Sequence, residues 1–256
     1  MNIVFEYIKY KWNAKGRHGI HSPFVYDLVD KVFKKIDFSA SNLKLLNQTF
    51  RSLKNNKKTI TIKDFGAGSH KLGNQRSIQE IFRVSSSKGH YGKILFQLSN
   101  YFQPKQILEF GTSLGIGTLH FHLGNPDSLI TTIEACPETL NFTKDFLQDK
   151  VSTINFIEST FSDFLNQIST EKYDLIFVDG HHDGKATIDY MQKLENHSHN
   201  DTIFILDDIR WSDDMFEAWS ILRNSKKYNV SIDLFRMGIL MPRKQQVKEH
   251  FVLRGK

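Results

Sequence analysis

The sequence contains a single cysteine, Cys136, among its 256 residues. One cysteine cannot form an internal disulfide, so a reducing cytoplasm is the simplest compartment. No run of about 18 apolar residues occurs, which argues against a membrane span. The opening stretch, MNIVFEYIKYKWNAKGRHG, lacks a continuous apolar segment and a small-residue cleavage site, and therefore does not resemble a signal peptide. We predict a cytoplasmic protein with no membrane partner.

The chain also lacks a strong charge imbalance, internal repeats and low-complexity tracts. Its 34 Lys and Arg residues against 28 Asp and Glu residues give a formal net charge of +6. The lysines are spread through segments such as KVFKK and LKNNKK, a pattern typical of solvated helix faces. A positive charge can also attract an anionic partner, so nucleic acid stays open as a minor alternative.

The residues that are abundant predict an α/β fold. After a helix expected at about 89–102, short apolar runs alternate with amphipathic stretches of helix length. The runs lie at 106–110, 129–134, 153–158, 173–179 and 202–208. Alternating strands and helices predict an open, mainly parallel sheet with helices on both faces. Apolar runs in the tail bring the expected sheet to seven strands.

The N-terminal part has a different pattern. Residues 1–50 predict two or three helices, and a polar, glycine-containing segment at 54–77 predicts a loop. We therefore expect an N-terminal helical extension at 1–87, which would form a cap, part of a substrate pocket or a homodimer contact. The sheet domain would occupy 88–256.

A glycine-rich turn follows the first apolar run of the sheet. Residues 109–117 read Glu-Phe-Gly-Thr-Ser-Leu-Gly-Ile-Gly. This G-x-x-x-G-x-G spacing differs from the G-x-G-x-x-G of dinucleotide folds, which disfavours a nicotinamide-dependent dehydrogenase. Glu134 ends the second run, where a carboxylate can accept both hydroxyls of a ribose. In such sheets the ligand lies beyond the carboxyl ends of the strands, so the residues just after each run are the candidates for function.

Four segments carry a family resemblance. ILEFGTSLGIGT, IEACPE, VDGHHD and ILDDIRW, in this order, resemble the class I S-adenosylmethionine (SAM)-dependent methyltransferases. More narrowly, they resemble the catechol O-methyltransferase-like and macrocin-type O-methyltransferases, over about residues 88–242. The whole chain is similar to uncharacterised bacterial members. The resemblance implies a Rossmann-like fold, SAM as cofactor and methyl transfer to a hydroxyl of a small molecule.

The resemblance also implies roles for particular residues. The glycine turn would hold the methionine end of SAM, Glu134 the ribose, and the turn after the third strand the adenine, although that turn matches the family weakly. Asp179 would lie near the sulfonium, and the segment around Gly92 would close over the cofactor. The implied SAM-binding residues are Glu109, Gly111, Thr112, Ser113, Gly115, Glu134, Ser159, Thr160, Asp179 and Gly92.

Three aspartates follow the fourth and fifth strands. Asp179, Asp207 and Asp208 would converge at one rim of the sheet, where uncompensated carboxylates repel one another. A bound Mg²⁺ would relieve this repulsion and lower the pKa of an acceptor hydroxyl. The alternative is a metal-free rim, in which Asp207 or Asp208 caps the following helix.

A base is needed if the hydroxyl enters protonated. His181 and His182 follow Asp179 and titrate near neutrality. We predict that one of them, with Asp179, forms the catalytic group, and His181 is favoured slightly. Asp183 is expected to cap the next helix.

Two other functions stay open: RNA ribose 2′-O-methylation, which fits the basic charge, and a non-catalytic SAM-binding or scaffold protein. The DFGAGS segment at 64–69 mimics a second glycine motif. No strand ending in an acid follows it at the required distance, so we interpret it as a turn or an active-site flap.

Overall fold

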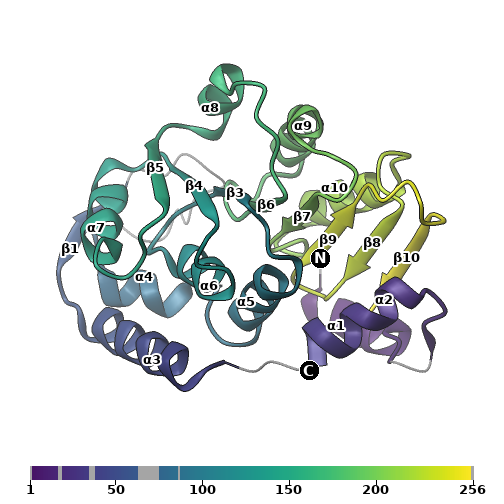
Figure 1. Ribbon diagram of the computed structural model, residues 1–256, viewed down its shortest axis with the longest axis horizontal. Helices are drawn as coiled ribbons and strands as arrows, with labels where there is room; N and C mark the ends of the chain where they lie inside the picture. Colours follow the sequence, from purple (N-terminus) through teal and green to yellow (C-terminus); the bar gives the residue numbers. More distant parts are fainter. Residues whose placement is uncertain (1, 17–18, 35–37, 63–74, 86, 255–256) are drawn as a thin grey trace.

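The computed structural model describes residues 2–16, 19–34, 38–62, 75–85 and 87–254. Its centre is an eight-stranded sheet with the order β10-β8-β9-β7-β6-β3-β4-β5 (Figure 1). The strands are β3 (Gln106–Phe110), β4 (Leu129–Glu134), β5 (Ile154–Glu158), β6 (Leu175–Val178), β7 (Ile203–Leu206), β8 (Val230–Asp233), β9 (Gly238–Met241) and β10 (Glu249–Val252). The predicted α/β class and mainly parallel sheet are confirmed. The sheet has eight strands where seven were expected, because the tail forms three.

The strand order places a topological switch point between β3 and β6. From β3 the chain runs outward through β4 to β5, then returns to the other side of β3 to form β6 and β7. These five strands are parallel, and Phe110 at the end of β3 is in register with Val178 at the end of β6. Ligands of open α/β sheets bind at such a point, beyond the carboxyl ends of the strands.

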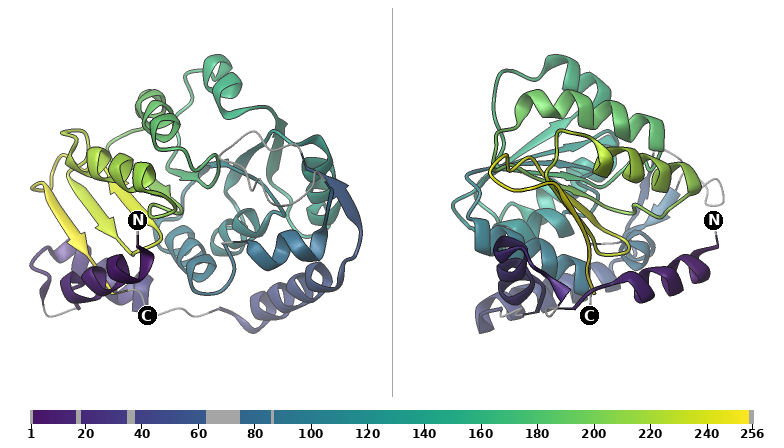
Figure 2. Two further views of the ribbon diagram at one scale, coloured as in Figure 1. Left: turned by 180° about the vertical axis from the view of Figure 1, so that it is seen from behind. Right: turned by 90° about the vertical axis from the view of Figure 1, so that its right-hand side faces the viewer.

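Helices cover both faces of the sheet (Figure 2). The strands alternate between the two faces: Ile107 packs into one hydrophobic cluster and Leu108 into the other. Helices α5 and η2 contribute to the first cluster, and α8, α9 and α10 to the second. The helices of this part are α5 (His90–Phe102), α6 (Ile116–Gly124), α7 (Pro137–Leu147), α8 (Phe161–Gln167), α9 (Gly184–Leu194), the 3₁₀ turn η3 (Glu195–His197) and α10 (Asp213–Asn224).

The N-terminal residues form the predicted helices and share the core of the sheet. They comprise α1 (Ile3–Asn13), α2 (Pro23–Leu28), the π-helical turn η2 (Val29–Lys34) and α3 (Ala40–Asn55). Ser22 caps α2 by accepting a hydrogen bond from the amide of Val25, and proline occupies the first helical position, as expected. Leu28 and Val32 are fully buried in the cluster that also contains Ile107. The boundary at residue 88 stays a prediction, but no separate core accompanies it among the described residues.

The segment expected to be a loop at 54–77 contains more structure than predicted. Strands β1 (Thr59–Thr61) and β2 (Gln75–Ser77) pair antiparallel, and α4 (Ile78–Val84) follows directly. A capping box between Ser77 and Glu80 begins α4. Ile60, Ile78 and Phe82 are buried against Leu114 of the glycine turn. The predicted turn or flap at 64–69 lies outside the described residues.

Among the helices of the described ranges, none is both long enough and apolar enough to cross a membrane.

Candidate active site

The glycine turn between β3 and α6 is anchored to the neighbouring strand. The amides of Gly111 and Thr112 both donate to the carbonyl of Ile133 at the end of β4. Gly111 has φ +100°, and a Cβ atom there would lie 1.9 Å from the carbonyl oxygen of Asp179. Gly115 has φ +69°, and a Cβ atom there would lie 2.4 Å from Leu147. Gly111 therefore requires glycine for conformation and for space, and Gly115 requires it for conformation.

Glu109 lies beneath this turn and points into the protein. Its carboxylate accepts hydrogen bonds from the hydroxyls of Thr118 at 2.5 Å and Thr132 at 2.8 Å. The residue is 1 % exposed, and burial raises its pKa to about 7. Thr112 is also buried, with its hydroxyl 2.7 Å from that of Thr132. These two predicted cofactor residues therefore support the turn from below, through two threonines that the sequence analysis did not single out.

Glu134 is held beside the turn at the end of β4. One carboxylate oxygen accepts from the amide of Ser113 and the other from the amide of Cys136, each at 3.0 Å. Burial raises the pKa of Glu134, and these hydrogen bonds oppose that effect. Two backbone donors thus fix the carboxylate on the ligand-binding edge of the sheet.

The turn after β5 lies next to Glu134. The amide of Ser159 donates to the carbonyl of Glu134 at 3.2 Å. Thr160 is the N-cap of α8 and accepts from the amide of Asp163 at 3.1 Å. Both Ser159 and Thr160 are partly exposed. The structure therefore brings the predicted adenine turn to the predicted ribose carboxylate.

Asp179 joins three segments at the switch point. Its amide donates to the carbonyl of Phe110 at 2.8 Å, so the ends of β3 and β6 stay paired. Its carboxylate accepts from the hydroxyl of Ser87 at 3.2 Å. Gly92 lets this segment approach α5, because a Cβ atom there would lie 2.1 Å from the Ser87 carbonyl. Ser87, which directly precedes the segment 88–93 predicted to close over the cofactor, therefore contacts Asp179.

Asp207 and Asp208 follow β7 at the same rim, and both contact Arg236. The Nε atom of Arg236 lies 2.7 Å from Asp208 Oδ1 and 3.4 Å from Asp207 Oδ1. Its Nη2 atom donates to Asp208 Oδ2 at 3.1 Å and to Asp207 Oδ2 at 3.4 Å. Burial and the adjacent Asp207 carboxylate raise the pKa of Asp208. An arginine thus supplies the positive charge that the sequence analysis expected from a metal ion.

The two histidines after Asp179 have different partners. His181 has φ +67°, and its Nδ1 atom is hydrogen-bonded to the hydroxyl of Tyr190 at 2.6 Å. His182 has φ +32°, and its Nε2 atom lies 3.8 Å from Asp208 Oδ2. The ring of His182 also packs on that of Trp211, with centroids 5.3 Å apart. His182 therefore lies beside Asp208, whereas His181 is hydrogen-bonded to Tyr190 of α9.

Comparison with known proteins identifies the family of this chain. A family model described as O-methyltransferase matches residues 69–247. The chain belongs to the O-methyltransferase family. The predicted family is thereby confirmed.

Relatives of this O-methyltransferase family member are distant. A protein of Mycobacterium sp. (strain JLS), provisionally named an O-methyltransferase, is 30 % identical over 93 residues. That match covers 35 % of this chain, and the chain spans only 42 % of the length of this curated relative. Its activity and substrates therefore bear on this chain only as a proposal.

Solved structures share the fold. The structure provisionally named caffeoyl-CoA O-methyltransferase from Staphylococcus aureus has a TM-score of 0.54 at 17 % identity, over 64 % of this chain and 88 % of that one. An O-methyltransferase from Bacillus cereus, solved in complex with S-adenosylhomocysteine (SAH), has a TM-score of 0.53 at 15 % identity. That comparison covers 84 % of this chain and 94 % of the other.

The three-aspartate metal site stays a prediction, and in the structure two of its three carboxylates face Arg236. Among the described residues, no group of three or more His, Cys, Asp or Glu side chains is arranged to hold a metal ion. All four carboxylate oxygens of Asp207 and Asp208 lie within 3.4 Å of Arg236 nitrogens. The sequence analysis missed Arg236, because its position at this rim depends on β9 lying between β7 and β8.

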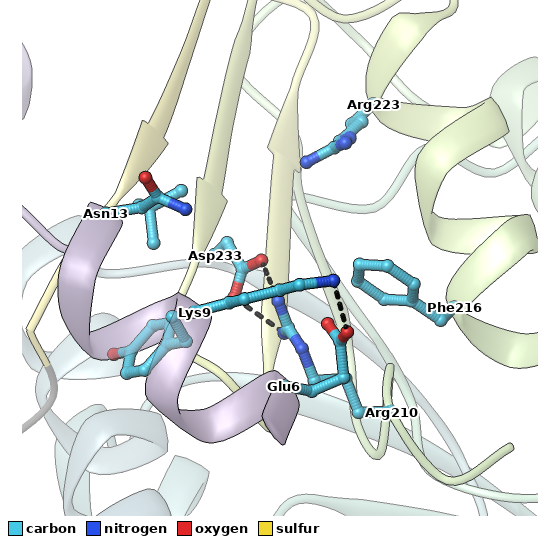
Figure 3. Close-up of a pocket in the computed structure, with 9 residues that line it drawn as sticks. Glu6, Lys9, Asn13, Arg210, Phe216, Arg223 and Asp233 are labelled. Carbon is cyan, nitrogen blue, oxygen red and sulfur yellow. Dashed lines mark hydrogen bonds and ion pairs between the residues drawn. The ribbon is translucent and has the colours of Figure 1, made fainter. Parts of the chain in front are cut away.

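A cavity of about 240 Å³ lies nearby, between α1, α10 and the ends of β8 and β10. Figure 3 shows Glu6 and Lys9 of α1 facing Arg210 and Asp233 across it. The charged groups pair with each other: Lys9 binds Glu6, and Arg210 binds Asp233 through two hydrogen bonds. None of the predicted site residues lines this cavity, so we do not place the acceptor there.

Proposed function

We propose that this chain is a SAM-dependent methyltransferase that transfers a methyl group to a hydroxyl of a small molecule. The observation that carries the proposal is the Glu134 carboxylate, which two backbone amides hold beside the glycine turn at the switch point. Membership of the O-methyltransferase family supports the reaction class. The cytoplasmic location and the homodimer stay predictions.

The residues at the switch point fit SAM as the donor. Glu134 has lone pairs left for ribose hydroxyls, and the carboxylate geometry suits both at once. The exposed side of the turn at Gly111 and Ser113 would face the methionine part, with Gly115 holding the shape of the turn. Ser159 and Thr160 would border the adenine. Glu109, Thr112 and Gly92 would act indirectly, by supporting the turn and the Ser87 segment.

On the acceptor side, His182 takes the role of general base. The Asp208 carboxylate lies 3.8 Å from its Nε2 atom, and Trp211 packs against its ring. His182 accepts the hydroxyl proton as the acceptor oxygen bonds to the methyl carbon, and the positive charge passes from sulfur to the imidazole. Bound SAM supplies this methyl on a sulfonium that leaves as a neutral thioether. Most of the rate enhancement comes from alignment and from the Asp179 carboxylate near the sulfonium.

No step of this mechanism passes through Mg²⁺. The carboxylates predicted to bind the metal are paired with Arg236, so the residues present do not fit the ion. The sequence left Mg²⁺ assistance and a metal-free rim both open; the proposed mechanism takes the metal-free alternative, and His182 removes the proton.

Calorimetric titration with SAM tests the proposed function. The wild-type protein should bind SAM saturably. Glu134→Ala should weaken binding about tenfold or more, because hydrogen bonds to a charged group contribute about 1.5–3 kcal/mol. Glu217→Ala, on the exposed face of α10, serves as the matched control and should bind as the wild type does. Absence of SAM binding by the wild type would favour the scaffold alternative, and unchanged binding by Glu134→Ala would remove the ribose assignment.

A further inference from the structure

Asp207 and Asp208 form an acid rim at the end of β7, with two negative charges in a small volume. Asp207 is 2 % exposed, and the side chain of Asp208 is 15 % exposed. Two adjacent carboxylates with this burial need a counter-charge, since an unpaired buried charge is strongly unfavourable. Mg²⁺ and arginine can each provide it, but they use the same oxygen atoms.

Arg236 is paired with both aspartates by charge. Its Nη2 atom donates to Asp208 Oδ2 at 3.1 Å, and its Nε atom lies 2.7 Å from Asp208 Oδ1 as an ion pair without a hydrogen bond. The same two nitrogens lie 3.4 Å from the two oxygens of Asp207. A magnesium ion bound to these oxygens at about 2.0–2.1 Å would place its charge beside the guanidinium, and the two positive charges would repel each other.

The backbone around Arg236 is fixed, so the side chain is presented to the rim by the fold. Arg236 lies in the tight turn between β8 and β9, and its carbonyl accepts from the amide of Ile209, which directly follows Asp208. Tyr91 of α5 donates to the carbonyl of Leu234 at 3.1 Å, and its ring lies 5.7 Å from the guanidinium. Phe235, at φ +75°, packs against Tyr7 of α1. Helices α1 and α5 therefore both contact this turn.

We propose that Arg236 permanently replaces the divalent cation at this rim, so that the protein works without a bound metal and depends on Arg236 to position Asp208 and His182. The role of Arg236 in positioning His182 rests on the proposed function, whereas the statement about metal binding does not. Arg236 is a positioning residue: it fixes Asp208, and Asp208 in turn lies 3.8 Å from the His182 ring. The arginine cannot lose its proton at physiological pH, so the counter-charge is constant where a metal ion would exchange.

The test uses Mn²⁺ as the probe, because its binding can be followed by paramagnetic resonance without knowing the acceptor. Chelator-treated wild-type protein should show no stoichiometric Mn²⁺ binding. Arg236→Ala exposes the carboxylates and should bind Mn²⁺ at least about tenfold more tightly than the wild type. Its thermal midpoint should fall and should be raised again by Mn²⁺, while that of the wild type should not respond. Arg223→Ala, in which a surface arginine bonded to His250 is removed, is the control and should gain no metal site.

The outcomes separate the two proposals. Stoichiometric Mn²⁺ binding by the wild type that Asp208→Asn abolishes would overturn the inference, since the arginine would then yield to metal. Failure of Arg236→Ala to gain Mn²⁺ binding while folded would overturn it as well. If Arg236→Ala does not fold, Arg236→Lys and the wild-type titration decide. Arg236→Lys keeps the positive charge but loses the Nη2 hydrogen bonds to Asp207 and Asp208, and it should gain Mn²⁺ affinity. Absence of SAM binding would defeat the proposed function alone and leave the Mn²⁺ result standing.

Discussion

Glu109 holds its proton more tightly in the folded protein than in the unfolded chain. Burial raises its pKa from 4.5 to about 7. For an acid whose pKa is raised by folding, the folded state binds more protons between those two values, so stability falls as pH rises. The contribution of Glu109 to stability is complete below about pH 4.5 and is lost as pH rises through about 7.

Glu109→Gln should remove this pH dependence. The amide is neutral at every pH, and its carbonyl oxygen can still accept from Thr118 and Thr132. Relative to the variant, the wild type should lose about 2–3 kcal/mol of unfolding free energy between about pH 5 and about pH 8, at about 1.4 kcal/mol for each pKa unit. Urea unfolding of both proteins at the two pH values measures this difference, with exposed Glu217→Gln as control. A difference that stays constant with pH would contradict the assignment.

The sequence predicted which residues surround the cofactor turn, but not the direction in which each side chain points. Glu109 was placed against the methionine part of SAM, yet the strand turns its carboxylate toward Thr118 and Thr132. That direction depends on which sheet face α6 covers, which spacing along the chain cannot reveal. Glu134 was easier to place, because the last residue of a parallel strand is at the ligand edge whichever face it lies on.

At the scale of elements, the start of α9 fixes the turn that carries both histidines. Asp183 is the N-cap of this helix, as predicted, and accepts from the amide of Ala186 at 2.8 Å. His181 and His182 immediately before it both have positive φ, an uncommon conformation for residues other than glycine. The Asp183 cap therefore helps to hold His181 and His182 in their positive-φ conformations.

Asp183→Ala should lower the unfolding free energy by about 1 kcal/mol, the usual effect of losing a side-chain cap. Asp183→Asn should keep most of that stability, since asparagine caps helices about as well as aspartate. Denaturant unfolding of the three proteins measures the effect. If the asparagine variant lost as much as the alanine variant, charge and not the capping hydrogen bond would be responsible.

Strand and helix positions were mostly predictable, and so was the neighbouring position of β6 and β7. Alternating apolar runs located β3 to β7, since each run is bounded by turn residues. The order of the tail strands came only from the structure, and this order brings the turn carrying Arg236 next to Asp207 and Asp208. The expected loop at 54–77 contains β1 and β2, and α4 follows it; Ile60 of β1 packs with Ile78 and Phe82 of α4 and with Leu114, which is distant in sequence.

At the scale of the whole molecule, α2 and η2 belong to the same hydrophobic core as the sheet. Leu28 of α2 is fully buried in the cluster that contains Ile107 of β3 and Ile239 of β9. Backbone contacts also join the segment after α1 to the last strand, since the amide of Lys15 donates to the carbonyl of Val252 at 2.8 Å. We therefore expect residues before and after position 88 to unfold together.

Leu28→Ala should destabilise the whole protein by about 2–5 kcal/mol, the range for removing a large buried aliphatic side chain. Leu43→Ala, on a side chain that is 45 % exposed, is the matched control and should change stability by about 0.5 kcal/mol or less. Unfolding followed by fluorescence and by circular dichroism should give coincident transitions. A separate early transition of the N-terminal helices would show instead that they form an independent unit.

The contact between Gly111 and Asp179 limits how this protein can be redesigned. A single methyl group at position 111 would lie 1.9 Å from the backbone oxygen of Asp179, the residue that follows β6. The ends of β3 and β6 therefore approach too closely for any side chain at position 111. A mutant library aimed at new acceptors can vary the exposed Trp211, but it should keep the glycine codon at position 111 unchanged.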